Sequence, residues 1–116
     1  MIGGFEINGA APKRLLIRGA GPGLTTLGVT NALASAHLQL INSANQSLIR
    51  ENYSWGTGND VDLVMAAEQA TGAFAYAPGS ADSAILIVLP PGTYTAILSG
   101  SGSSTGTALV EVYEVP

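Results

Sequence analysis

Alternating hydrophobic and polar positions are clearest in the last third of the chain, residues 84–116. Three strand-like stretches occur there, joined by a Pro-Pro-Gly turn at residues 90–92 and a loop rich in Gly and Ser. Side chains of a strand alternate between two faces, so the middle stretch divides into two sets. One face carries Tyr94, Ala96 and Leu98, and the other carries Thr93, Thr95 and Ile97. In the last stretch, Val110 and Val112 oppose an outer face of Leu109, Glu111 and Tyr113.

The first half of the chain contains further strand patterns. Phe5–Ile7 is a short candidate, and Lys13–Gly19 is a longer one that follows a turn. Residues 37–42 and 46–52 flank the turn-forming stretch Asn-Ser-Ala-Asn, which indicates a β-hairpin. Within residues 13–19, we expect Leu15 and Ile17 to point inward and Arg14 and Arg18 to point outward.

Residues 60–71, DVDLVMAAEQAT, have the spacing of a helix. Asn59 or Asp60 can cap its first turn, where acidic residues interact favourably with the helix dipole. Gly72 provides the stop. Residues 20–35 are irregular and predict a long connection with one helical turn.

These elements predict an all-β fold: a jelly-roll-like β-sandwich of about seven or eight short strands, with one inserted helix near residues 60–71. The length of 116 residues is that of a single domain, residues 1–116. Charged residues make up only 10% of the chain, against about 25% in ordinary soluble domains. The surface is therefore mostly Ser, Thr, Asn, Gln, Gly and Ala, which is typical of secreted, wall-associated or polymer-contacting modules.

Charge and cysteine content exclude several functions. The net charge is −4, and only Lys13, Arg14, Arg18 and Arg50 are basic, which argues against nucleic acid or an anionic membrane as a partner. The chain has no cysteine, so disulfides, thiolate metal sites and cysteine nucleophiles are excluded.

Localisation is inferred from composition. Residues 1–10 have no basic and apolar stretch of the signal-peptide kind, and the longest apolar run, residues 84–91, is far shorter than the ~20 residues of a membrane helix. We expect a secreted or cell-surface module, trimmed or excised from a longer protein.

The residues also argue against catalysis. His37 is the only histidine, and no G-x-S-x-G motif is present to supply a serine nucleophile. Asp60 and Asp62 lie in the expected first helical turn, where acids normally stabilise the helix. We therefore expect that the protein is not an enzyme.

The Gly-rich loop after the hairpin contains the best candidates for ligand binding: Tyr53, Trp55, Asn52, Asn59 and Asp60. Aromatic rings stack on sugar rings, and neighbouring amides and carboxylates can hydrogen-bond sugar hydroxyls. The alternative for Trp55 is that it plugs the end of the sandwich and anchors the following helix.

Asp60 and Asp62 are also the candidates for calcium. Calcium binds six to eight oxygens, several of them from carboxylates, and loop carbonyls could contribute here. The loop does not match the EF-hand pattern, so we expect no obligatory cofactor.

Four segments carry a resemblance to a known kind of module: KRLLIRGAGPGL, NYSWGTGND, residues 71–100 and GTALVEVYEV. Together they resemble a β-sandwich repeat of large secreted bacterial multidomain proteins, over roughly residues 13–115. The last two segments are also similar to the bacterial pre-peptidase C-terminal domain, through PGTYT and the following LSG. The resemblance implies an accessory module, a spacer, or a role in adhesion or glycan contact. Pre-peptidase-type domains sometimes carry calcium, but their dense acidic loop is missing here.

The pattern and the resemblance favour a non-catalytic extracellular accessory module that binds a neutral polysaccharide. The alternative is a structural spacer, or a self-assembling or fibre-forming module that acts through strand or sheet-face contacts. A short edge at residues 4–7 and an apolar stripe at Leu109 and Tyr113 are the features that suggest self-association or contact with neighbouring modules.

Overall fold

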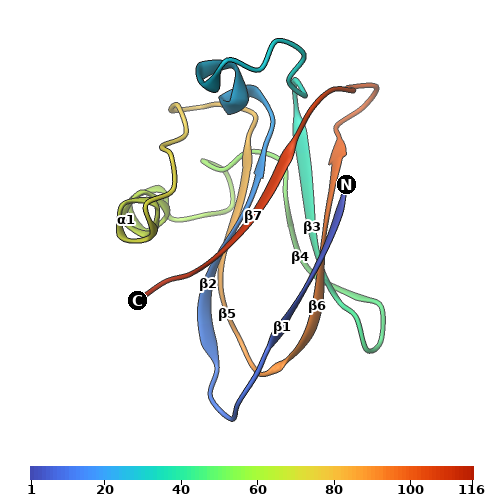
Figure 1. The fold of residues 1–116 in the computed structure, drawn as a ribbon, viewed down its shortest axis with the longest axis vertical. Helices are drawn as coiled ribbons and strands as arrows, with labels where there is room; N and C mark the ends of the chain where they lie inside the picture. The colour runs from blue at the N-terminus through green and yellow to red at the C-terminus, as the bar shows by residue number, and fades with distance from the viewer.

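The computed structural model describes residues 1–116 and contains two antiparallel sheets that face each other (Figure 1). Sheet A has the strand order β1-β6-β3-β4, and sheet B has the order β5-β2-β7. The strands are β1 (Ile2–Ile7), β2 (Lys13–Ala20), β3 (Ala36–Asn42), β4 (Ser47–Asn52), β5 (Ser83–Leu89), β6 (Gly92–Gly100) and β7 (Leu109–Glu114). A 3₁₀ helix, η1 (Pro22–Leu27), and one α-helix, α1 (Val61–Thr71), complete the fold.

The order of the strands confirms the all-β sandwich expected from the sequence. Only the β3–β4 hairpin joins neighbours within one sheet, and every other connection between successive strands crosses from one sheet to the other. This crossing pattern is the jelly-roll-like feature of the fold. The hairpin and the three closing strands form where the alternating patterns predicted them.

The main core lies between the two sheets. It is built from the inward positions of each strand, which follow the two-residue period. In β3 and β6 the buried residues are strictly alternate. The cluster consists of Ile7, Leu15, Ile17, Leu33, Ala36, Leu38, Leu40, Ile85, Leu89, Tyr94, Ala96 and Leu98.

A second apolar layer covers the outer face of sheet B. Figure 1 shows α1 beside β2, β5 and β7, on the side opposite to sheet A. Val64 and Ala67 of the helix pack with Leu16 and Ala20 of β2, and Trp55 completes the layer. β2 is therefore buried on both faces, as central strands covered on both sides are.

The local signals for α1 are confirmed. Asp60 caps the helix by accepting hydrogen bonds from the backbone N–H groups of Asp62 and Leu63. Gly72 ends it in the left-handed conformation, with φ of 77°. Both are the usual devices of helix ends. Neither α1 nor η1 has the length and apolar character needed to cross a membrane.

The expectation that Arg18 points outward is correct for the face of β2 but wrong as a statement about solvent. Arg18 does leave the main core, but its exposed fraction is 0%. The outer face of sheet B is covered by α1 and by the segment that contains Phe74 and Tyr76. The alternating pattern of one strand cannot predict that a helix about 50 residues later in the chain covers its outer face.

Candidate binding surface

The outer face of sheet A, unlike that of sheet B, is covered by no helix or loop layer. The register aligns side chains from β4, β3 and β6 in rows across this face. The two rows at one end consist of Tyr53, His37 and Ser99, followed by Glu51, Gln39 and Ile97. All six side chains are partly or fully exposed. The result is a shallow surface that mixes one aromatic ring with polar groups.

Tyr53 is the aromatic centre of this surface. Its ring stacks on the imidazole of His37, with centroids 4.0 Å apart and an angle of 4° between the planes. Directly opposed residues of an antiparallel pair bring side chains this close, and these two residues lie one position beyond the last aligned pair, Leu38 and Asn52. Tyr53 is 52% exposed, so the ring face turned away from His37 is open to solvent.

Polar groups surround the Tyr53 ring, and one of them orients the His37 imidazole on which the ring stacks. His37 Nε2 lies 3.1 Å from Glu51 Oε1, which holds the imidazole beneath Tyr53. A shallow cavity of about 370 Å³ lies beside the ring, lined in part by Ser54 and Thr57. The surface therefore offers a flat apolar ring with hydroxyl and carboxylate groups within reach.

Trp55 lies two residues away but belongs to the core. It is 2% exposed, packs in the second apolar layer, and donates a hydrogen bond from Nε1 to the carbonyl oxygen of Ala77 at 3.0 Å. Its ring also contacts Tyr76, with centroids 6.2 Å apart. Trp55 thus presents no open ring face to a ligand. Its position agrees with the alternative stated above, in which Trp55 fills the end of the sandwich and anchors the following helix.

The amides expected to bind a ligand are engaged in the fold. Asn52 donates from Nδ2 to the carbonyl of Thr57 and accepts at Oδ1 from the N–H of Ala84. Asn59 donates from Nδ2 to the carbonyls of Trp55 and Ala84. These hydrogen bonds fasten the Trp loop to the edge of β5, so the two side chains position the loop.

The remaining candidates, Asp60 and Asp62, lie at the start of α1. The Asp60 carboxylate caps the helix, as described above, and Asp62 lies in its first turn. No group of three or more His, Asp and Glu side chains converges in the structure as ligands of a metal ion would. Of the five residues expected to bind ligand, Tyr53 and Asp60 are exposed, and Asp60 is engaged as the helix cap.

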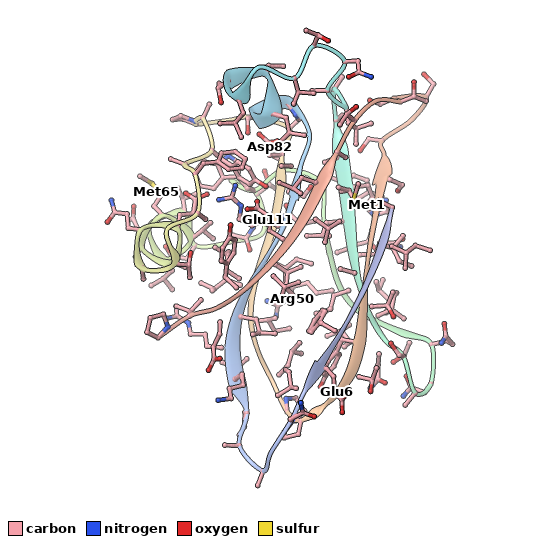
Figure 2. The ribbon with its side chains drawn as sticks, in the orientation of Figure 1. Met1, Glu6, Arg50, Met65, Asp82 and Glu111 are labelled. Atoms are coloured by element: carbon pink, nitrogen blue, oxygen red, sulfur yellow. The ribbon has the colours of Figure 1, made fainter.

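A buried ionic cluster, which the sequence analysis missed, lies on the opposite side of the molecule between β2, α1 and β7. Arg18 Nη1 is 3.2 Å from Glu68 Oε2, and Arg18 Nε is 3.3 Å from Glu111 Oε1. The guanidinium carbon lies 4.4 Å from the ring centroid of Phe74 and 3.9 Å from that of Tyr76. Figure 2 shows Glu111 between β7 and the helix. The cluster joins three distant segments.

Burial determines the protonation behaviour of this cluster. Burial raises the pKa of Glu68 above its ordinary value of 4.5, and the positive charge of Arg18 only partly opposes this. Burial also raises the pKa of Tyr113, whose hydroxyl donates a hydrogen bond to Glu111. With Arg18 and Glu68 almost fully covered, the cluster acts within the fold and offers no surface for a ligand.

A second buried polar residue, Asp82, organises the η1 end of the sandwich (Figure 2). Its Oδ1 accepts hydrogen bonds from the N–H groups of Gly21 and Gly23, and its Oδ2 accepts one from the hydroxyl of Ser80. A Cβ at Gly23 would lie only 3.0 Å from Asp82 Oδ2, so a side chain there would force the carboxylate to shift. Asp82 is therefore a structural anchor for the Gly-rich turn.

Comparison of the chain with protein-family models, with curated proteins and with solved structures gives no match.

Proposed function

We propose that this chain is a non-catalytic accessory module that binds a neutral polysaccharide on the outer face of sheet A. The observation that carries the proposal is the open ring of Tyr53, held flat against His37. A ring fixed in this way loses little conformational freedom when a ligand covers it, and such preorganisation increases affinity.

The chemistry of the surface favours a sugar. An aromatic face attracts the C–H groups of a pyranose ring, while nearby hydroxyl, amide and carboxylate groups hydrogen-bond its hydroxyls. Gln39 and Ser99 lie on the same face as Tyr53, and Ser54 lies beside the ring. The low charge of the whole chain favours a neutral ligand over an acidic one.

The shape of the surface favours a polymer. The row next to that of Tyr53, which begins at Glu51, continues across β3 and β6 to β1, where Ile2 is aligned with Ile97. A long, shallow face can make many weak contacts along an extended polymer. A single sugar on the same face would make only a few of them. Resemblance to repeats of large secreted bacterial proteins supports an extracellular setting for such a ligand.

The test is calorimetric titration of the whole chain with a panel of soluble neutral polysaccharides. We expect saturable binding of one class, and a loss of about tenfold in affinity, or about 1.4 kcal/mol, in the Tyr53→Ala variant. Val88→Ala is the matched control, because Val88 is an exposed hydrophobic residue on β5 of the other sheet.

The fluorescence of Trp55 can be followed in the same titration as a second measurement. Because Trp55 is buried, we expect its fluorescence emission to be blue-shifted and to stay unchanged as the glycan binds. Undiminished affinity in a folded Tyr53→Ala protein would reject the proposed site, and a panel without any binding would reject the proposed function.

A further inference from the structure

The four edge strands of the sandwich differ in how their outward backbone groups are covered. On β5, side chains satisfy three such groups: Asn52 accepts from Ala84 N–H, Asn59 donates to Ala84 C=O, and Arg50 donates to Leu86 C=O. An edge covered in this way cannot pair with another strand. Side-chain cover of this kind is one means by which proteins avoid edge-to-edge association.

The edges of β4 and β7 differ from each other. β4 contains a register shift opposite Leu40 and Ile41, which leaves Ile49 without a partner. Such a bulge disrupts pairing along an edge. β7 pairs with β2 without a shift from Leu109 to Glu114, so its edge is as regular as that of β1. Of these two edges, only that of β4 is interrupted.

β1 has none of these obstructions. Its register with β6 runs from Ile2 to Ile7 without a shift. Hydrogen bonds in both directions join Met1 to Leu98, so residues 1, 3, 5 and 7 face β6 in the antiparallel ladder. The N–H and C=O groups of residues 2, 4 and 6 therefore point to the free edge. Ile2 is also 72% exposed, more than any other large hydrophobic residue.

A shallow cavity with a mixed polar and apolar lining lies near each end of β1. One, of about 400 Å³, is lined by Phe5, Ile7 and Val112, and the other, of about 290 Å³, is lined by Met1 and Leu98. Figure 2 labels Met1 and Glu6 near the two ends of β1.

We propose that β1 pairs with β1 of a second copy of this chain, antiparallel and about a two-fold axis at Gly4. Gly4 then faces Gly4 of the second copy with both backbone hydrogen bonds formed, and each Ile2 faces a Glu6. The surface is self-complementary, as a two-fold interface requires, and the two Glu6 carboxylates stay apart. Sheet A becomes one continuous sheet across both copies.

The pairing does not depend on glycan binding, but it has a consequence for it. The outer faces of the two copies of sheet A become continuous, so each dimer presents two Tyr53 rings to one ligand. A polymer that reaches both rings gains avidity without any new contact.

The test measures the mass of the whole chain by light scattering over a wide range of concentrations. We expect a mass that rises towards twice that of the monomer, and a monomer throughout for Gly4→Lys. A side chain at position 4 has room in the monomer, because the nearest atom to a Cβ there is Tyr94 O at 3.9 Å. In the dimer it places two like charges opposite each other, which destabilises the pair. Val88→Lys, with the same charge on an edge of sheet B, should behave like the unmodified chain.

A mixing experiment tests the register. Gly4→Lys and Gly4→Glu should each be monomeric, and an equimolar mixture should recover the dimer, because lysine then faces glutamate across the axis. A monomer at every concentration of the unmodified chain, or a dimer that persists in Gly4→Lys, would overturn the proposal. Growth beyond a dimer would also overturn it. Glycan titration of Gly4→Lys separates the two proposals, since its single Tyr53 ring is intact.

Discussion

The outer faces of the two sheets differ in whether other parts of the chain cover them. The outer face of sheet B is covered by α1 and the Trp loop, which bury an apolar layer and the Arg18 cluster. The outer face of sheet A carries only its own partly exposed side chains, with Tyr53 at one end. One outer face therefore contributes to stability, and the other is available for contact.

The difference is visible in the strands themselves. β2 is buried at nearly every position, because both of its faces are covered, whereas β3 and β6 alternate between buried and partly exposed residues. Continuous burial is the mark of a strand covered on both sides. Substitutions on the two faces should accordingly affect different properties, and the following predictions are ordered by the size of that effect.

The largest effect is expected for Arg18→Ala. It leaves Glu68 and Glu111 buried without their cation, and breaking a buried ion pair on one side costs about 3–5 kcal/mol. Urea unfolding followed by circular dichroism measures the loss. Arg14→Ala is the control, because Arg14 is exposed on the same strand and should cost less than about 0.5 kcal/mol. Equal losses for the two variants would show that the cluster does not stabilise the fold.

A comparable loss is expected for Trp55→Ala, which empties part of the layer beneath α1. Replacing a buried tryptophan by alanine costs about 3–5 kcal/mol. Tyr53→Ala, two residues away, should cost less than about 1 kcal/mol, because half of that ring is already in solvent. The same unfolding measurement checks both variants. A greater loss for Tyr53→Ala would reverse the assignment of the two aromatic residues.

A smaller effect is expected from pH. Because the pKa of Glu68 is higher in the folded chain than its ordinary value of 4.5, the folded state holds this proton more tightly than the unfolded state. The resulting stability is present below about pH 4.5 and is lost as pH rises through the folded pKa. Glu68→Gln removes this loss, so its free energy of unfolding should rise relative to the unmodified chain as pH increases. Parallel stability curves for the two proteins would contradict the raised pKa.

The smallest effect is expected for His37→Ala, which removes the support beneath Tyr53. Stacked aromatic pairs contribute about 0.5–1.5 kcal/mol, and we expect glycan affinity to fall by up to that amount. Stability should change by less than about 1 kcal/mol, since the hydrogen bond between His37 and Glu51 is on the surface. Calorimetric titration next to Tyr53→Ala measures the difference. A larger loss of affinity for His37→Ala than for Tyr53→Ala would mean that His37 itself contacts the ligand.

Much of the fold follows from local pattern. The hairpin, the three closing strands and α1 with its caps all depend on alternation, turn residues and capping residues within a few positions of one another. Arg18 and Asp82 could not be placed in this way. Their partners lie far along the chain: Glu68 is 50 residues from Arg18, and Gly21 is 61 residues from Asp82.

The candidate site was predicted only in part for the same reason. Tyr53 and Trp55 share a loop of similar composition on both sides, and no local signal tells which ring turns inward. Asn52 and Asn59 have the chemistry of ligand-binding amides, but in the fold their side chains form hydrogen bonds with backbone groups at the edge of β5. Extending the register next to the hairpin turn would place His37 opposite Asn52, and only the shift at Leu40 and Ile41 brings it opposite Tyr53.

The position of β2 in sheet B also determines when the protein can fold. β2 lies between β5 and β7, so sheet B cannot be completed before residues 109–114 are present. During synthesis, the apolar residues of β2 remain without one of their neighbouring strands until residues 109–114 have emerged from the ribosome. Sheet B therefore depends on contacts between segments that are distant along the chain, and such contacts slow folding and prolong the exposure of apolar strands.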